Sequence, residues 1–278
     1  MSTPAPLRLR PLEIGDVLDE TFRLYRRHFL LLGGVAVAFS LPLAALAGYG
    51  LGNLFGTLAT QAASGNPPDV STLSGTFLGV GLGYLVYILL VPLQYGAITY
   101  AVCEAALGHP VTLWSAFRGG IRRYLHVLGL VALVLGMAIV FCLFPLWIWI
   151  LVGWIAVLPA MFIENIGLGA AFSRSWRLVQ GRWWRTFFIV FLVYILTNVV
   201  SAALGAFLYL GQALLAIVLS PLITFTIYEA ALIIVSALVV PILIIAMVLI
   251  YFDLRVRKEG IDLFQLADHI ATQPSTAG

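Results

Sequence analysis

Arginines interleaved with aromatic residues are the side chains best suited to binding chemistry in this sequence. They fall in three short segments, residues 22–29, 117–124 and 176–185, each of which precedes a long uncharged stretch. Guanidinium groups bind phosphates well, and basic clusters beside membrane spans are typical of anionic-lipid recognition. Arg, Trp and Tyr also serve as plain anchors at a membrane edge, so both interpretations stay open. The binding candidates are Arg23, Arg26, Arg27, Arg118, Arg122, Arg123, Arg177, Arg182, Trp183, Trp184 and Arg185.

Carboxylates form the second set of candidates, because Glu104, Glu164 and Asp253 each follow an uncharged stretch. One interpretation is structural: the acids pair with nearby arginines and hold the basic segments against the spans, a kind of contact that signals little about function. The other is a ring of carboxylates that faces a cavity or a partner. The pairs that the sequence allows are Glu104 with Arg118 or Arg122, and Glu164 with Arg174 or Arg177.

Few polar side chains lie within the uncharged stretches themselves. Gln94 and Asn198 are the amides well inside them, and we expect each to bond across to a neighbouring helix. Ion and proton pathways use acidic, basic or histidine side chains within spans. Here the nearest such groups, His126 and Glu229, stand at the ends of stretches, which argues against an ion-coupled transporter.

No catalytic motif accompanies these residues. The patterns GxSxG, HExxH and CxxC are absent, Lys258 is the only lysine, and the four histidines are dispersed. A metal cluster or a nucleophile–base pair would therefore need coincidental convergence in the fold. The basic residues lie beside apolar stretches, without a motif that reads nucleic acid. We expect a protein that is not an enzyme and has no cofactor, no metal and no nucleic-acid partner.

The composition identifies the medium in which these residues work. The chain has 278 residues, of which 62% are hydrophobic and 10% charged, whereas soluble proteins have about 45–50% apolar and about 25% charged residues. A water-soluble fold of this length could not bury so much apolar surface. The composition thus excludes a soluble enzyme, a disordered chain and a disulfide scaffold, and it predicts an all-α integral membrane protein.

The charges predict the number of crossings. Five stretches lack Asp, Glu, Lys and Arg, and two of them, 124–163 and 186–228, are long enough for two crossings each. Basic residues mark cytoplasmic loops, and all of them lie on one side only if the first of these stretches crosses twice and the second once. This predicts six spans at 29–52, 77–103, 124–144, 146–163, 186–211 and 230–252, between a cytoplasmic N-terminus (1–28) and a cytoplasmic tail (253–278).

The spans form three helical hairpins in this scheme, each preceded by a basic amphipathic helix in the membrane interface. In the first such helix Val17, Thr21 and Tyr25 recur at every fourth position and make one face. Asp19 precedes Arg23 by four residues, which predicts an ion pair along the helix.

The external ends of the spans carry further signals. GxxxG patterns at 48–52 and 79–83 predict that the first two spans approach closely there. The segment 53–76 reads as a polar external loop, and 212–228 lies outside the membrane core or re-enters it. We expect no disulfide between Cys103 and Cys142, because they stand near opposite faces of the membrane.

Three motifs together resemble one known family. They are RPLEIGDVLD at 10–19, AFSRSWRLVQGRWWR at 171–185 with Glu164 ahead of it, and YFDLRVRKEGIDL at 251–263. The chain resembles the glycerophosphoryl diester phosphodiesterase membrane-domain superfamily over about residues 10–265. The resemblance implies a multi-span helical module, which in some relatives is attached to a soluble phosphodiesterase barrel. These residues contain no alternating strand–helix region and no metal-binding carboxylate and histidine set, so the resemblance transfers no catalysis.

The sequence therefore predicts a non-enzymatic, multi-pass protein of a prokaryotic plasma membrane; the prokaryotic source is suggested by the preference for Arg over Lys. We expect its inner-face belt of Arg and aromatic residues to bind anionic lipid headgroups, a cytoplasmic or membrane protein partner, or both. The alternative is a permease or flippase-like component for an apolar or lipid substrate. That alternative predicts a cavity that reaches Gln94 or Asn198.

Overall fold

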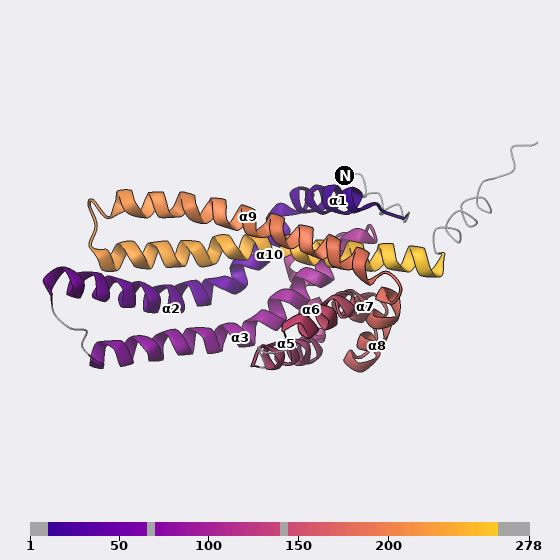
Figure 1. The fold of residues 1–278 in the computed structure, drawn as a ribbon, viewed down its shortest axis with the longest axis horizontal. Helices are drawn as coiled ribbons and strands as arrows, with labels where there is room; N and C mark the ends of the chain where they lie inside the picture. The colour runs from indigo at the N-terminus through magenta and orange to yellow at the C-terminus, as the bar shows by residue number, and fades with distance from the viewer. Residues whose placement is uncertain (1–10, 66–69, 140–143, 261–278) are drawn as a thin grey trace, which may run out of the picture.

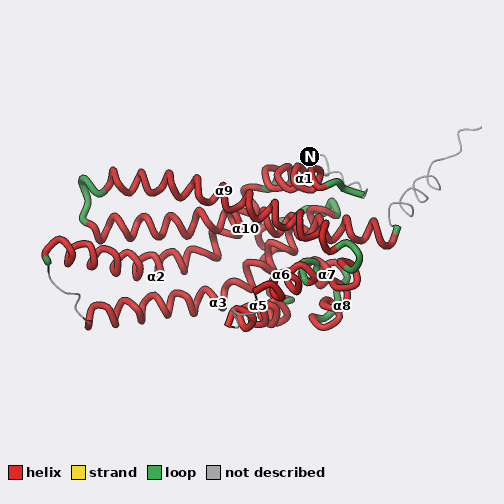
Figure 2. Tube along the Cα trace, viewed as in Figure 1, coloured by secondary structure: helices red, strands yellow, loops and turns green. Residues whose placement is uncertain are grey.

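The computed structural model describes residues 11–65, 70–139 and 144–260, and within these ranges the regular structure is helical with no strand (Figures 1 and 2). Several of the helices are long and apolar enough to cross a membrane, so the chain is a multi-pass membrane protein. The helices are α1 Ile14–Arg27, α2 Phe29–Ser64, α3 Val70–Ala106, α4 Leu113–Arg122, α5 Tyr124–Ile139, α6 Phe144–Gly153, α7 Val157–Ile163, α8 Leu168–Val179, α9 Trp183–Leu215 and α10 Pro221–Glu259.

Four long helices, α2, α3, α9 and α10, form the body of the molecule. They have 36, 37, 33 and 39 residues, so at 1.5 Å per residue each is about 50 Å long or longer. Figure 1 shows the end of α2, the start of α3 and the α9–α10 turn at the same end of the molecule. The central helix is α10, which packs along both α2 and α9 and whose Ile245, Val248 and Tyr251 are fully buried.

The short helices gather toward the opposite end, around the halves of the long helices that lie away from the α9–α10 turn (Figure 1). The three basic segments of the sequence lie in or beside α1, α4, α8 and the start of α9. Helices α4 and α5 meet at an angle of 69°. By length and composition the described residues contain five candidate spans, or six if this bent pair forms one.

Two segments expected outside the membrane helices are helical in the structure. The predicted polar loop 53–76 is largely taken up by the end of α2 and the start of α3. The segment 212–228 is the tip of the α9–α10 hairpin, in which α9 runs to Leu215 and α10 begins at Pro221. Proline is well tolerated at a first helical position because its missing N–H would have no partner there, so Pro221 can start α10 within this segment.

The glycine patterns do bring helices together, although not always the expected ones. A Cβ on Gly50 would meet Val80 of α3, and one on Gly83 would meet Ala47 of α2 at 3.0 Å. Gly48 and Gly52 instead contact α10, at Ala230 and Thr226. The predicted close approach of the first two spans, α2 and α3, is therefore confirmed at Gly50 and Gly83, whereas Gly48 and Gly52 of the first GxxxG pattern face α10. Cys103 is buried as a free thiol, and Cys142 lies outside the described residues.

Candidate functional site

The described arginines divide into two sets. In one set the guanidinium groups make no hydrogen bond or ion pair with any described residue, and five of its six members are exposed. Arg23 is exposed too, but it pairs with Glu20 rather than with the expected Asp19. The unpaired set is Arg26, Arg27, Arg118, Arg122, Arg177 and the half-buried Arg182. The bonded set is Arg123, Arg174, Arg185, Arg255 and Arg257.

Asp253 forms the centre of the first bonded cluster. Its side chain is fully buried, and it makes ion pairs with Arg185 at 2.5 Å and Arg257 at 2.8 Å. The backbone N–H of Leu12 donates to the same carboxylate at 2.8 Å. Both arginines also donate to the Leu12 carbonyl oxygen. A buried charge must be paired to be tolerated, so this cluster ties the N-terminal segment to the start of α9 and the end of α10.

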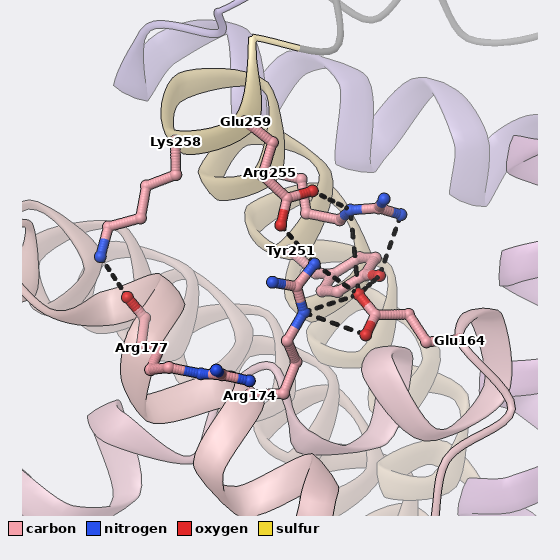
Figure 3. Close-up of polar contacts among 7 residues, drawn as sticks. All are labelled: Glu164, Arg174, Arg177, Tyr251, Arg255, Lys258 and Glu259. Carbon is pink, nitrogen blue, oxygen red and sulfur yellow. Dashed lines mark hydrogen bonds and ion pairs between the residues drawn. The ribbon is translucent and has the colours of Figure 1, made fainter.

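Glu164 forms the second cluster, shown in Figure 3. Arg174 of α8 donates to both of its carboxylate oxygens, at 2.8 and 3.0 Å, and the Tyr251 hydroxyl donates to one of them at 2.8 Å. Arg174 also pairs with Glu259, which in turn pairs with Arg255 at 2.9 Å. Helix α8 is thereby attached to the end of α10 through a continuous network of charges.

The acids are thus engaged in structural contacts. The expected pair of Glu164 with Arg174 is confirmed, whereas Glu104 contacts His109 at 2.7 Å instead of Arg118 or Arg122. Burial alone would lower the pKa of Arg174, but the hydrogen bonds and charges of Glu164 and Glu259 outweigh it and raise that pKa. Arg174 therefore stays cationic, and these contacts leave Asp253 and Glu164 surrounded by partners from their own chain.

Helix α1 presents its cations by burying its opposite face. A capping box between Glu13 and Asp16 starts the helix. Val17 and Thr21 are buried as expected, and the Tyr25 hydroxyl donates to the Leu238 carbonyl of α10 at 2.6 Å.

Helix α4 follows the same plan with a closer approach. Thr112 and Ser115 form its capping box. A Cβ on Gly119 would overlap the Tyr100 ring of α3, and one on Gly120 would lie 2.7 Å from the Ala97 backbone nitrogen. Arg118 and Arg122 remain exposed. The Arg123 guanidinium group instead donates to the Ile166 carbonyl at 2.7 Å and to the Asn165 side chain. Arg123 therefore does not belong to the unpaired arginines.

Helix α8 packs into an interruption between α6 and α7, which lies within the predicted span 146–163 and was not indicated by the sequence pattern. The buried Ser175 hydroxyl donates to the Gly153 carbonyl at 2.7 Å and accepts from the Ala156 N–H at 3.1 Å. It thereby satisfies backbone groups that the break leaves without helical partners. The Trp176 ring fills the space beside Gly153, where a Cβ would overlap it. A serine within a basic segment gives no signal of this role.

The tryptophans of the third segment differ in their surroundings. The Trp183 indole N–H donates to the Trp149 carbonyl at 3.1 Å, while Trp184 is 69% exposed. A side chain with an apolar ring and a polar N–H suits a membrane–water boundary. Trp114 of α4 is also exposed and stacks on Phe117, so an exposed indole accompanies the exposed Arg118 and Arg122 of that helix.

An open cleft of about 500 Å³ adjoins this region and is lined by Trp154, Phe172, Ser173, Trp176 and Arg177. Four of these residues belong to α8, and Trp154 belongs to the break between α6 and α7. The cleft combines three aromatic rings with one hydroxyl and one cation, which no spacing pattern in the sequence revealed.

The two intramembrane amides behave differently. Gln94 is buried and donates to the Ala36 carbonyl of α2 at 3.1 Å, which confirms the expected bond between helices. Asn198 is exposed and donates to the Tyr194 carbonyl of its own helix at 2.8 Å, so the expected bond across to a neighbour is wrong for this residue. Neither amide lines the cleft beside α8.

Among the described residues, no three His, Cys, Asp or Glu side chains are placed to hold a metal ion. Comparison with known proteins gave no match to any family model, curated protein or solved structure.

Proposed function

We propose that this protein is a non-enzymatic membrane module whose exposed arginines bind anionic lipid headgroups at the cytoplasmic face. The observation that carries the proposal is the division of the described arginines: Arg23 and five others bond within the chain, whereas Arg26, Arg27, Arg118, Arg122 and Arg177 are exposed and unpaired among the described residues. Phosphate groups are the natural partners of such guanidinium groups at a bilayer surface.

The membrane arrangement that we propose with it has six spans in three hairpins and both termini in the cytoplasm of a prokaryotic cell. The charges support this orientation, since cytoplasmic loops carry the excess of Lys and Arg. In Figure 1 the helices α1 and α8, the start of α9 and the end of α10, which bear described basic residues, lie toward the end opposite the α9–α10 turn. The arginines could then reach one leaflet together.

Membership in the superfamily named above is part of the same proposal. Its support is that all three motifs contribute to the Asp253 cluster: Leu12 from the first, Arg185 from the second, and Asp253 with Arg257 from the third. These motifs can therefore be understood as a structural closure of the bundle. A permease or flippase-like role has no comparable support, because Gln94 is bonded to α2 and Asn198 faces outward.

The test uses a variant in which glutamine replaces four arginines at once: Arg26, Arg27, Arg118 and Arg122. The full chain is then reconstituted into bilayers. Spin-labelled phosphatidylglycerol and phosphatidylcholine then report the relative association of anionic and zwitterionic lipid with the protein. An arginine near an anionic surface contributes about 1 kcal/mol to the attraction of anionic lipid. The preference for phosphatidylglycerol over phosphatidylcholine should therefore fall roughly fivefold at each lipid site next to a replaced arginine.

The matched control carries lysine at the same four positions and should keep the preference, because the charge is retained. An anionic preference that is the same in the glutamine variant and the unaltered protein would refute lipid binding by the belt. A protein partner captured by the belt would then become the better explanation of the exposed cations.

A further inference from the structure

The cleft beside α8 has one polar and one aromatic side. Arg177 and Ser173 supply a cation and a hydroxyl, and Trp154, Phe172 and Trp176 supply the rings. The contact of the Arg177 backbone carbonyl with Lys258 of α10 fixes its main chain. Its guanidinium group, by contrast, has no hydrogen-bond or ion-pair partner among the described residues.

Arg177 differs sharply from Arg174, which lies one helical turn earlier. Figure 3 shows Arg174 bonded to Glu164 and Glu259, whereas the only contact drawn for Arg177 is through its carbonyl oxygen. The two nearby carboxylates, Glu164 and Glu259, are thus occupied by Arg174, which neighbours Arg177 along the same side of α8. The positive charge at the cleft is therefore not neutralised by any described carboxylate.

The walls of the cleft are held in place by packing. The Trp176 ring lies edge-on to Trp149 with centroids 4.5 Å apart, and Trp154 packs on Phe172 at the same centroid distance. Between them Ser175 bonds both sides of the helix break. A site whose rings are already ordered loses little conformational entropy when a ligand binds.

The chemistry of the cleft fits a phosphate carried on an apolar molecule. A guanidinium group can bind two phosphate oxygens at once, and a serine hydroxyl can donate a further hydrogen bond. A free phosphate ion would use only this polar side and leave the rings unoccupied. Glycerol and the first methylenes of an acyl chain would cover the rings, as is usual for aromatic residues at a membrane boundary.

We propose that this cleft is a discrete site for one phospholipid molecule, whose headgroup phosphate is bound by Arg177 and Ser173 and whose glycerol region packs on the three rings. The inference rests on the proposed function in one respect, because it places α8 at headgroup level. It adds a single saturable site to the diffuse attraction of the belt.

Native mass spectrometry of the full chain in detergent tests the site. The probes are phosphatidylglycerol, diacylglycerol, which lacks the phosphate, and inorganic phosphate as a competitor. We expect one phosphatidylglycerol molecule to be retained at saturation and diacylglycerol not to be retained. The variant Arg177→Gln should weaken retention about tenfold or more, since a hydrogen bond to a charged group is lost, and Ser173→Ala should weaken it less. Both side chains lie in an open cleft, and an unchanged thermal midpoint will show that the variants fold.

The matched control is Arg118→Gln, which removes an exposed, unpaired arginine outside the cleft. Equal losses in Arg177→Gln and Arg118→Gln would overturn the discrete site and leave only the belt. Retention of diacylglycerol, or displacement of the lipid by millimolar inorganic phosphate, would overturn the assignment to a phospholipid. The belt test leaves Arg177 intact, so a failed belt with a lost site in Arg177→Gln would reject the general function and keep this inference.

Discussion

Replacing Asp253 with asparagine tests whether one buried carboxylate holds the N-terminal segment on the bundle. The side chain is 0% exposed, and its ion-pair partners Arg185 and Arg257 are each 22% exposed. Asparagine keeps the shape but loses the charge, so two guanidinium groups would remain close together without a counter-ion. Removing one partner of a buried ion pair costs about 3–5 kcal/mol. Because the arginines are partly hydrated, we expect the lower end, about 3 kcal/mol.

Hydrogen exchange followed by mass spectrometry measures this loss where it should occur. The Leu12 N–H donates to Asp253, and α1 packs on α10, so the amides of residues 12–24 report the closure. A loss of about 3 kcal/mol corresponds to roughly hundredfold faster exchange if this segment opens locally. The matched control Glu20→Gln breaks a pair whose Arg23 side chain is 71% exposed, and it should change exchange by less than about fivefold.

A second substitution separates charge from shape. Adding Arg185→Gln to Asp253→Asn removes one of the uncompensated cations, so the double variant should be less destabilised than the sum of the two single variants. Contacting residues typically couple by about 0.5–3 kcal/mol. Exchange in Asp253→Asn as slow as in Glu20→Gln, or strictly additive effects in the double variant, would refute the role assigned to Asp253.

Three further predictions concern contacts between helices and are checked by thermal unfolding in detergent. Gly119→Ala should destabilise the protein by about 1–3 kcal/mol, because the new methyl group overlaps the Tyr100 ring. The control Gly79→Ala, whose methyl group meets nothing within 4 Å, should stay within about 1 kcal/mol of the unaltered protein, and equal effects would contradict the close approach of α4 to α3. Ser175→Ala should destabilise the protein by about 1–3 kcal/mol, because it leaves the Gly153 carbonyl and the Ala156 N–H unpaired. The control Ser173→Ala replaces an exposed side chain and should have almost no effect, and an equally small effect of Ser175→Ala would show that the break between α6 and α7 does not need the Ser175 hydroxyl. Gln94→Leu should destabilise the protein by about 0.6–2 kcal/mol, because it removes the hydrogen bond to the Ala36 carbonyl. Asn198→Leu should leave the stability unchanged, and a larger loss in Asn198→Leu than in Gln94→Leu would mean that Asn198 has a partner outside this chain.

The helices of this fold follow from local patterns that the sequence displays. Apolar stretches longer than a bilayer predict α2, α3, α9 and α10, and the basic amphipathic segments predict α1, α4 and α8. The pair of Glu164 with Arg174 was also predictable, since the two residues stand ten positions apart across one turn. Helices and nearby ion pairs depend on residues close together in the sequence, so the sequence can predict them without knowledge of the fold.

The missed features depend on backbone groups and on contacts distant in sequence. Leu12 acts through its N–H and carbonyl, which every residue has, and its partner is 241 residues away. Ser175 acts on two backbone groups in another helix. Asn198 faces outward because α9 packs chiefly on α10, an arrangement that the sequence pattern does not specify. The same distant contacts decide which arginines are bonded within the chain and which are unpaired, so the sequence alone could not predict the two sets.

The link between Leu12 and Asp253 also has a consequence for synthesis of the chain. The ribosome adds about 5–20 residues per second, and the two partners are separated by 241 positions, so a newly made N-terminal segment waits on the order of 10–50 s for its acceptor. During that interval the first amphipathic helix can rest only on lipid or on earlier spans. Release of a nascent chain before its last helix would leave the Leu12 N–H without its Asp253 acceptor, so the N-terminal segment of an incomplete copy would stay unattached at this point.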